Sequence, residues 1–136
     1  MTSNESAFWT DLIEDLQDPE FLREYVTQSI RVSTIDTVVN ALNVARESAG
    51  LSKAQLARAI NMDPATVRRL FTANGSNPTL GTLAEVAAVL GLRISVTPAS
   101  PLEQDIVAAS LRAGGATDTE ALVAALDPTN QVVPTR

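Results

Sequence analysis

The side chains that most often carry enzyme chemistry are missing from this chain. Its 136 residues include no cysteine and no histidine. This composition excludes thiol catalysis, hydroxyl nucleophiles activated by histidine, disulfides, and zinc or haem sites that use these ligands. Carboxylates remain, but no pair of them stands out from what a solvated acidic surface would show. We therefore expect a protein that is not an enzyme and that binds no metal or other cofactor.

Basic side chains are the other groups able to do chemistry, and they are concentrated in the middle of the chain. The 10 Lys and Arg against 16 Asp and Glu give a formal charge of −6. Residues 36–97 carry six basic and four acidic residues (net +2), residues 1–35 carry two and seven (net −5), and residues 98–136 carry two and five (net −3). Only the middle is suited to a polyanion, and it would need a shaped surface, presented twice by a dimer.

Helix signals run along almost the whole sequence and divide it into three segments. Residues 1–34 form an N-terminal helical extension, residues 35–97 a central domain, and residues 98–136 a small helical hairpin with a loose tail. No apolar run approaches the length of a membrane span, and the first residues lack the pattern of a secretion signal. The expected location is the cytoplasm, away from membranes.

The N-terminal extension presents apolar helix faces that are a candidate docking surface for a partner protein. The alternative is that these faces pack on the rest of the protein or across a dimer. The second helix begins at Asp18-Pro19, an N-cap followed by Pro at the first helical position. The partner-binding candidates, which recur at helical spacing, are Trp9, Leu12, Ile13, Leu16, Leu22 and Tyr25.

Capping residues predict the other helix boundaries. Ser33 or Thr34 is expected to start a new helix that ends at Gly50, and Thr117 with Glu120 to form a capping box before the last helix. Between these helices the alternation of apolar and polar residues over 92–97 predicts one short β-strand. It would pair with a symmetry mate, a partner protein or a distant segment, because a lone strand leaves its backbone groups unsatisfied.

The closely spaced capping and turn residues between Ser52 and Pro64 predict two short helices joined by a tight turn. Ser52 and Gln55 form an S-x-x-Q capping box. After Asn61, which tolerates left-handed backbone, Asp63-Pro64 starts the next helix. A connection this short is typical of a helix-turn-helix rather than of a bundle hairpin.

Residues 51–70, LSKAQLARAINMDPATVRRL, resemble the helix-turn-helix of the Xre family, the group of lambda repressor and Cro. Ala57 stands where the family keeps a small residue so that the two helices cross closely. Val67 and Leu70 stand at its buried recognition-helix positions, and Asn61 replaces the usual turn glycine. The resemblance implies an all-α protein with a five-helix Xre-type core, to which the N-terminal extension, the short strand and the C-terminal hairpin are added.

The resemblance also implies how double-stranded DNA would be read. The helix from Pro64 to Phe71 would lie in the major groove. Because Pro64 and Ala65 cannot donate hydrogen bonds from their side chains, direct readout should be sparse, with more dependence on thymine methyl groups and DNA shape. The implied base contacts are Arg69, Arg68, Thr66 and Ala65, and the implied phosphate contacts are Ser52, Lys53, Gln55, Thr72, Asn74 and Ser76.

Together with the preceding DPEFLREY helix and the following NPTLGTLAEVAAVLGLRISV, the segment is similar to HigA-type antitoxins. Members of that group bind a small ribonuclease toxin encoded beside them and repress their shared promoter as dimers. The resemblance therefore implies a homodimer on a palindromic operator and a small basic toxin as partner. Two alternatives remain: a stand-alone, prophage-like Xre regulator, and a protein-interaction module that has lost DNA binding.

Overall fold

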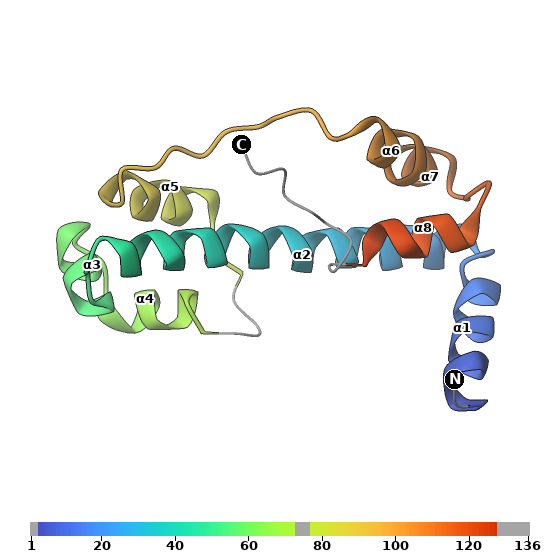
Figure 1. Cartoon of the computed structure of the whole chain (residues 1–136), viewed down its shortest axis with the longest axis horizontal. Helices are drawn as coiled ribbons and strands as arrows, with labels where there is room; N and C mark the ends of the chain where they lie inside the picture. Colours follow the sequence, from blue (N-terminus) through green and yellow to red (C-terminus); the bar gives the residue numbers. More distant parts are fainter. Residues whose placement is uncertain (1–2, 73–76, 128–136) are drawn as a thin grey trace. The chain divides into compact units, whose positions relative to one another are not determined.

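The computed structural model describes residues 3–72 and 77–127 and divides the chain into two compact units. The terminal unit combines Met1–Ser33 with Pro98–Arg136, and the central unit is Thr34–Thr97. Figure 1 shows that the described residues fold into helices joined by turns and one extended connection. Along these residues, no helix has both the length and the apolar character needed to cross a membrane.

One long helix, α2 (Pro19–Ser48), belongs to both units (Figure 1). Its start at Asp18-Pro19 is confirmed, because the Asp18 carboxylate accepts a hydrogen bond from the backbone N–H of Glu20 at 3.0 Å. The predicted helix start at Ser33 or Thr34 is wrong. The Ser33 hydroxyl instead donates to the Ile30 carbonyl at 3.3 Å, within the helix. No proline or glycine interrupts this stretch, so the helix continues through the expected boundary.

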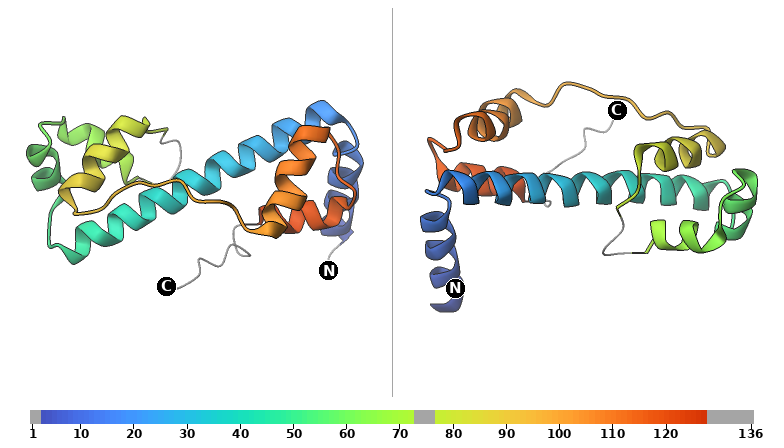
Figure 2. Two further views of the ribbon diagram at one scale, coloured as in Figure 1. Left: turned by 90° about the horizontal axis from the view of Figure 1, so that it is seen from above. Right: turned by 180° about the vertical axis from the view of Figure 1, so that it is seen from behind.

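Both ends of the sequence contribute to the core of the terminal unit (Figure 2). Its helices are α1 (Ser3–Asp15), the first part of α2, a continuous helical segment made of α6 (Pro101–Glu103), the π-helical η1 (Gln104–Ala108) and α7 (Ala109–Ala113), and then α8 (Thr119–Leu126). The N-terminal helices and the C-terminal hairpin, which are far apart in sequence, thus bury their apolar faces together. The buried residues of this core are Leu12, Leu16, Leu22, Val26, Val107, Leu122, Val123 and Leu126.

This core accounts for three of the partner-binding candidates. Leu12, Leu16 and Leu22 are buried within the terminal unit, so they are not available to a partner. Ile13 and Tyr25 are half-buried. Trp9 keeps 44% of its surface exposed. For the three leucines, packing within the protein is therefore the interpretation that the structure favours.

The expected β-strand is not formed. Residues 92–100 are extended, but no strand occurs in the part of the chain that the structure describes. The Leu92 N–H donates to the Ala87 carbonyl at 2.8 Å, which closes α5 (Leu80–Val89), and Val96 is 99% exposed. Of the apolar residues within 92–97, only Ile94 packs on the core of the central unit. Alternating apolar residues favour a strand only where a neighbouring strand can pair with them.

The last helix begins one residue later than predicted. Asp118, rather than Thr117, caps α8 by accepting a hydrogen bond from the Ala121 N–H at 3.1 Å. An aspartate at this position caps at least as well as a threonine, so the shift carries no loss of helix stability.

Gly114 ends the preceding helix, α7, and is also required for a tertiary contact. Its φ of 76° is left-handed, and a Cβ placed on it would lie 2.9 Å from Nη2 of Arg23. The Arg23 guanidinium donates to the carbonyls of Leu111 at 3.1 Å and Arg112 at 3.4 Å. Arg23 of α2 thereby satisfies carbonyls at the end of α7 that have no partner within their own helix.

We expect Gly114→Ala to lower the free energy of unfolding of the terminal unit by about 2 kcal/mol, because the new methyl group meets both a strained backbone and the Arg23 guanidinium. Urea unfolding followed by the emission of Trp9, the single tryptophan, measures this unit. Gly115→Ala is the matched control, since its Cβ would meet no atom within 4 Å. Equal losses in the two variants would contradict the assignment.

Candidate nucleic-acid interface

The central unit is built from short helices around the end of α2. Its helices are the second part of α2, α3 (Lys53–Ala59), α4 (Pro64–Leu70) and α5 (Leu80–Val89). Figure 1 shows α3, α4 and α5 gathered around the C-terminal turns of α2. Their common core consists of Leu42, Leu56, Ala57, Val67, Leu70, Val86 and Ala87.

The predicted capping box fixes the first turn of α3. The Ser52 hydroxyl accepts from the Gln55 N–H at 3.0 Å, and the Gln55 side-chain oxygen accepts from the Ser52 N–H at 2.8 Å. Both side chains are exposed. Because the oxygen of Gln55 is used in the box, its amide nitrogen is the group left to donate to a phosphate.

The turn between α3 and α4 also has the predicted geometry. Asn61 adopts a left-handed φ of 51°, and the Met62 N–H donates to the Ala57 carbonyl at 2.9 Å. Asp63 then caps α4 by accepting from the Ala65 N–H at 2.9 Å, with Pro64 at the first helical position. The Asp63 carboxylate is therefore held by a backbone donor at the helix start, where its charge stabilises α4.

Helix α4 has one buried face and one basic face. Val67 and Leu70, three residues apart, are buried in the central core. Arg68 and Arg69, which stand between them in sequence, are exposed. Nη2 of Arg69 lies 3.5 Å from the Thr66 hydroxyl, so these two side chains meet on the surface of the helix. This surface can offer guanidinium groups to an acceptor outside the protein.

The other predicted contact residues differ in how accessible their side chains are. Ala65 and Thr66 on α4 and Lys53 on α3 are half-buried. The Thr72 hydroxyl donates to the Arg68 carbonyl at 2.6 Å, so it would have to rotate before it could donate to a phosphate. Asn74 and Ser76 lie outside the described residues.

One basic residue of this unit has a structural role that the sequence did not reveal. The side chain of Arg46 is only 13% exposed, and its guanidinium lies 5.6 Å from the ring centre of Phe71. It donates to the Leu51 carbonyl at 2.6 Å and to the Asn43 side-chain oxygen at 2.9 and 3.1 Å, and it lies 3.6 Å from Glu47. Arg46 thus connects the end of α2 to the residues just before α3 and just after α4.

Comparison with known families agrees with this geometry. Residues 42–96 match a family model described as Helix-turn-helix, a span that contains α3, α4 and α5. The match supports an Xre or lambda-repressor type of helix-turn-helix and, with it, a DNA-binding transcriptional regulator. Neither the curated proteins nor the solved structures yielded a significant match to the chain.

We expect Arg46→Met to lower the free energy of unfolding by about 2 kcal/mol, because methionine fills similar space but cannot donate to Leu51 or Asn43. Urea unfolding followed by far-ultraviolet circular dichroism measures the loss. Arg58→Met on the exposed surface of α3 is the control and should change the stability by less than about 0.5 kcal/mol. If both variants unfold at the same urea concentration, Arg46 does not hold these elements together.

Proposed function

We propose that the protein is a sequence-specific transcriptional repressor that reads double-stranded DNA with α4. The observation that carries this proposal is the division of α4 into a buried face, Val67 and Leu70, and an exposed basic face, Arg68 and Arg69. A helix held in this way can enter the major groove with its basic face forward. The Arg69 guanidinium can then donate to O6 and N7 of one guanine.

The contacts around Arg69 divide between bases and phosphates. Thr66, within 3.5 Å of Arg69, would lie beside the same base pairs, and the Ala65 methyl group would face a thymine methyl group. Lys53 and the Gln55 amide nitrogen would bind phosphates, which fixes the position of the protein without reading sequence. With so few side-chain donors at the start of α4, DNA shape supplies part of the specificity.

A homodimer is the form in which the central unit would bind. Its net charge of only +2, from six basic and four acidic residues, is too small for tight binding by one copy. Two copies related by a two-fold axis would read a palindromic operator with half-sites about 34 Å apart.

We propose further that the repressor is the antitoxin of a type II pair, which binds a small basic ribonuclease toxin and represses their shared promoter. The charge division favours this function. The terminal unit carries four basic and twelve acidic residues, a net charge of −8, whereas the central unit is mildly basic. A cationic protein would be attracted to the first unit while the second remains free for DNA. A stand-alone regulator is the competing outcome.

Arg69→Ala should weaken binding to a fluorescent duplex of the chain's own upstream region by about 1–3 kcal/mol, because the guanine contact is lost. Arg58→Ala is the matched control: it removes the same charge from the neighbouring helix and should have a smaller effect that is equal for all sequences. Titrations at two salt concentrations separate the contribution of phosphate contacts to the binding free energy from that of base contacts, because the phosphate contribution falls as salt is raised. A folded wild-type protein that does not bind would contradict the DNA-reading proposal and favour the interaction module.

The antitoxin proposal is tested by expressing the reading frame next to the gene, alone and together with this protein. We expect a small basic product that stops growth alone, is neutralised by co-expression, and co-purifies with a dimer of this chain in a light-scattering mass measurement. If the neighbour is harmless, or growth is not restored, the protein acts as a stand-alone regulator. A monomer at micromolar concentration would exclude the dimeric operator complex.

A further inference from the structure

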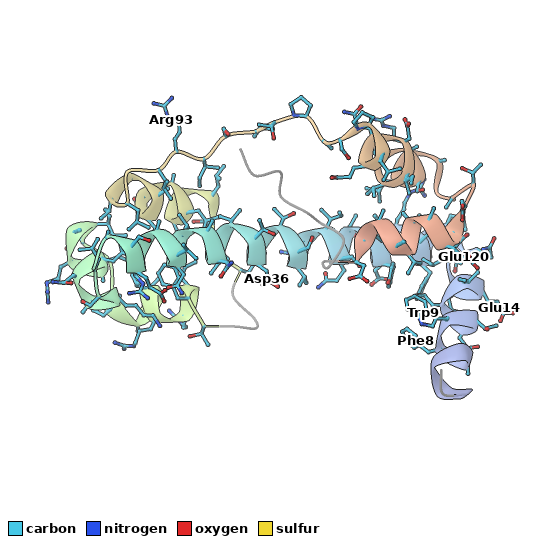
Figure 3. The ribbon with its side chains drawn as sticks, viewed as in Figure 1. Phe8, Trp9, Glu14, Asp36, Arg93 and Glu120 are labelled. Carbon is cyan, nitrogen blue, oxygen red and sulfur yellow. The ribbon has the colours of Figure 1, made fainter. Side chains whose placement is uncertain are left out.

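The apolar stripe of α1 is covered at one end only. Leu12 and Leu16 are buried in the terminal core, but Phe8 and Trp9, one turn earlier, are 61% and 44% exposed. Their rings form an edge-to-face pair with centres 5.8 Å apart, and Figure 3 shows both projecting from the same side of α1. Two neighbouring exposed aromatic rings on a helix otherwise packed into a core indicate a surface that another molecule covers.

Carboxylates border this aromatic pair. Asp11 and Asp15, three and seven residues after Phe8, lie along the Phe8 edge of the helix and are exposed. Among the described residues, neither has an ion-pair partner. Glu14 points from the other side of α1, as Figure 3 shows, and does not belong to this edge. The surface therefore combines two aromatic faces with two unpaired negative charges.

The charge of the terminal unit indicates which occupant fits this surface. A second copy would bring another unit of net charge −8 against the first, and like charges disfavour that contact. The unit has few cations to offset this repulsion, and Arg23 already donates to the carbonyls of Leu111 and Arg112. A cationic partner would instead be attracted to this surface, because aromatic faces and carboxylates both attract guanidinium groups.

We propose that Phe8 and Trp9, with Asp11 and Asp15, form the docking surface for an arginine-rich segment of a basic protein. An arginine of that segment stacks on the aromatic pair while its N–H groups donate to the carboxylates. This inference deepens the proposed antitoxin function by assigning the partner contact to one edge of α1. It does not depend on DNA binding, which belongs to the central unit.

The single tryptophan makes this surface directly observable in the full chain, because all tryptophan emission comes from Trp9. We would titrate the protein with octaarginine and, separately, with uncharged octaglutamine. Octaarginine should change the Trp9 emission to saturation and lose affinity as salt is raised, whereas octaglutamine should have no effect. Phe8→Ala should weaken octaarginine binding by roughly three- to fivefold.

Charge variants test the acidic edge without removing any apolar contact. Asp11→Asn combined with Asp15→Asn should weaken octaarginine binding at least as much as Phe8→Ala. Asp105→Asn, which removes a charge of the same unit from a different helix, is the control and should leave the affinity within about twofold. Circular dichroism confirms that each variant is folded.

Three results would overturn the inference. The first is a Trp9 emission that octaarginine leaves unchanged, and the second is a loss of affinity in Asp105→Asn equal to that in the Asp11→Asn, Asp15→Asn variant. The third is a Trp9 emission that depends on protein concentration alone, together with a dimer that Phe8→Ala dissociates. That third result would make a second copy of this chain the occupant of the surface. Loss of DNA binding with retained octaarginine binding would instead reject only the DNA-reading proposal.

Discussion

The burial of Val67 and Leu70 in the core shared with α3 is the constraint on which the candidate interface depends. Ala57 on α3 is fully buried in that core, and its small side chain allows the two helices to approach closely. Once the apolar face of α4 is buried, helical geometry places Arg68 and Arg69 outside. The basic surface is therefore a consequence of the packing, and a larger residue at Ala57 would displace it.

The basic residues of the central unit divide between one with a structural role, Arg46, and those that are exposed or half-buried and available to a ligand. The Arg46 side chain is only 13% exposed and donates to Asn43 and Leu51 beside the ring of Phe71, so it is poorly placed to bind a polyanion. The cations available on the helix-turn-helix are then carried by α3 and α4. A unit with so few available charges needs correct geometry and a second copy to bind DNA tightly, since bulk attraction is weak.

The local features of the fold could be predicted from the sequence. The capping box at Ser52, the left-handed Asn61 and the Asp63 cap are each determined by residues within one or two turns of helix, so their pattern is visible in the sequence. The burial of Val67 is implied instead by the resemblance to the Xre family. Two of the features that were not predicted depend on distant partners: the core shared by the N-terminal helices and the C-terminal hairpin, and the position of Arg46 against Phe71. The continuity of α2 has a local cause, because no proline or glycine stops the helix at Ser33 and Thr34. The residues 92–97 alternate like a strand but find no strand to pair with.

The central claim is that Arg69 reads a guanine in the major groove, and methylation interference tests it most directly. A methyl group on guanine N7 occupies the position of the proposed hydrogen bond. Wild-type protein should be excluded from duplexes methylated at one guanine in each half-site, and Arg69→Ala, which lacks that contact, should lose this discrimination. An interference pattern that is the same in both proteins would contradict the account, because the guanine would then be read by another side chain.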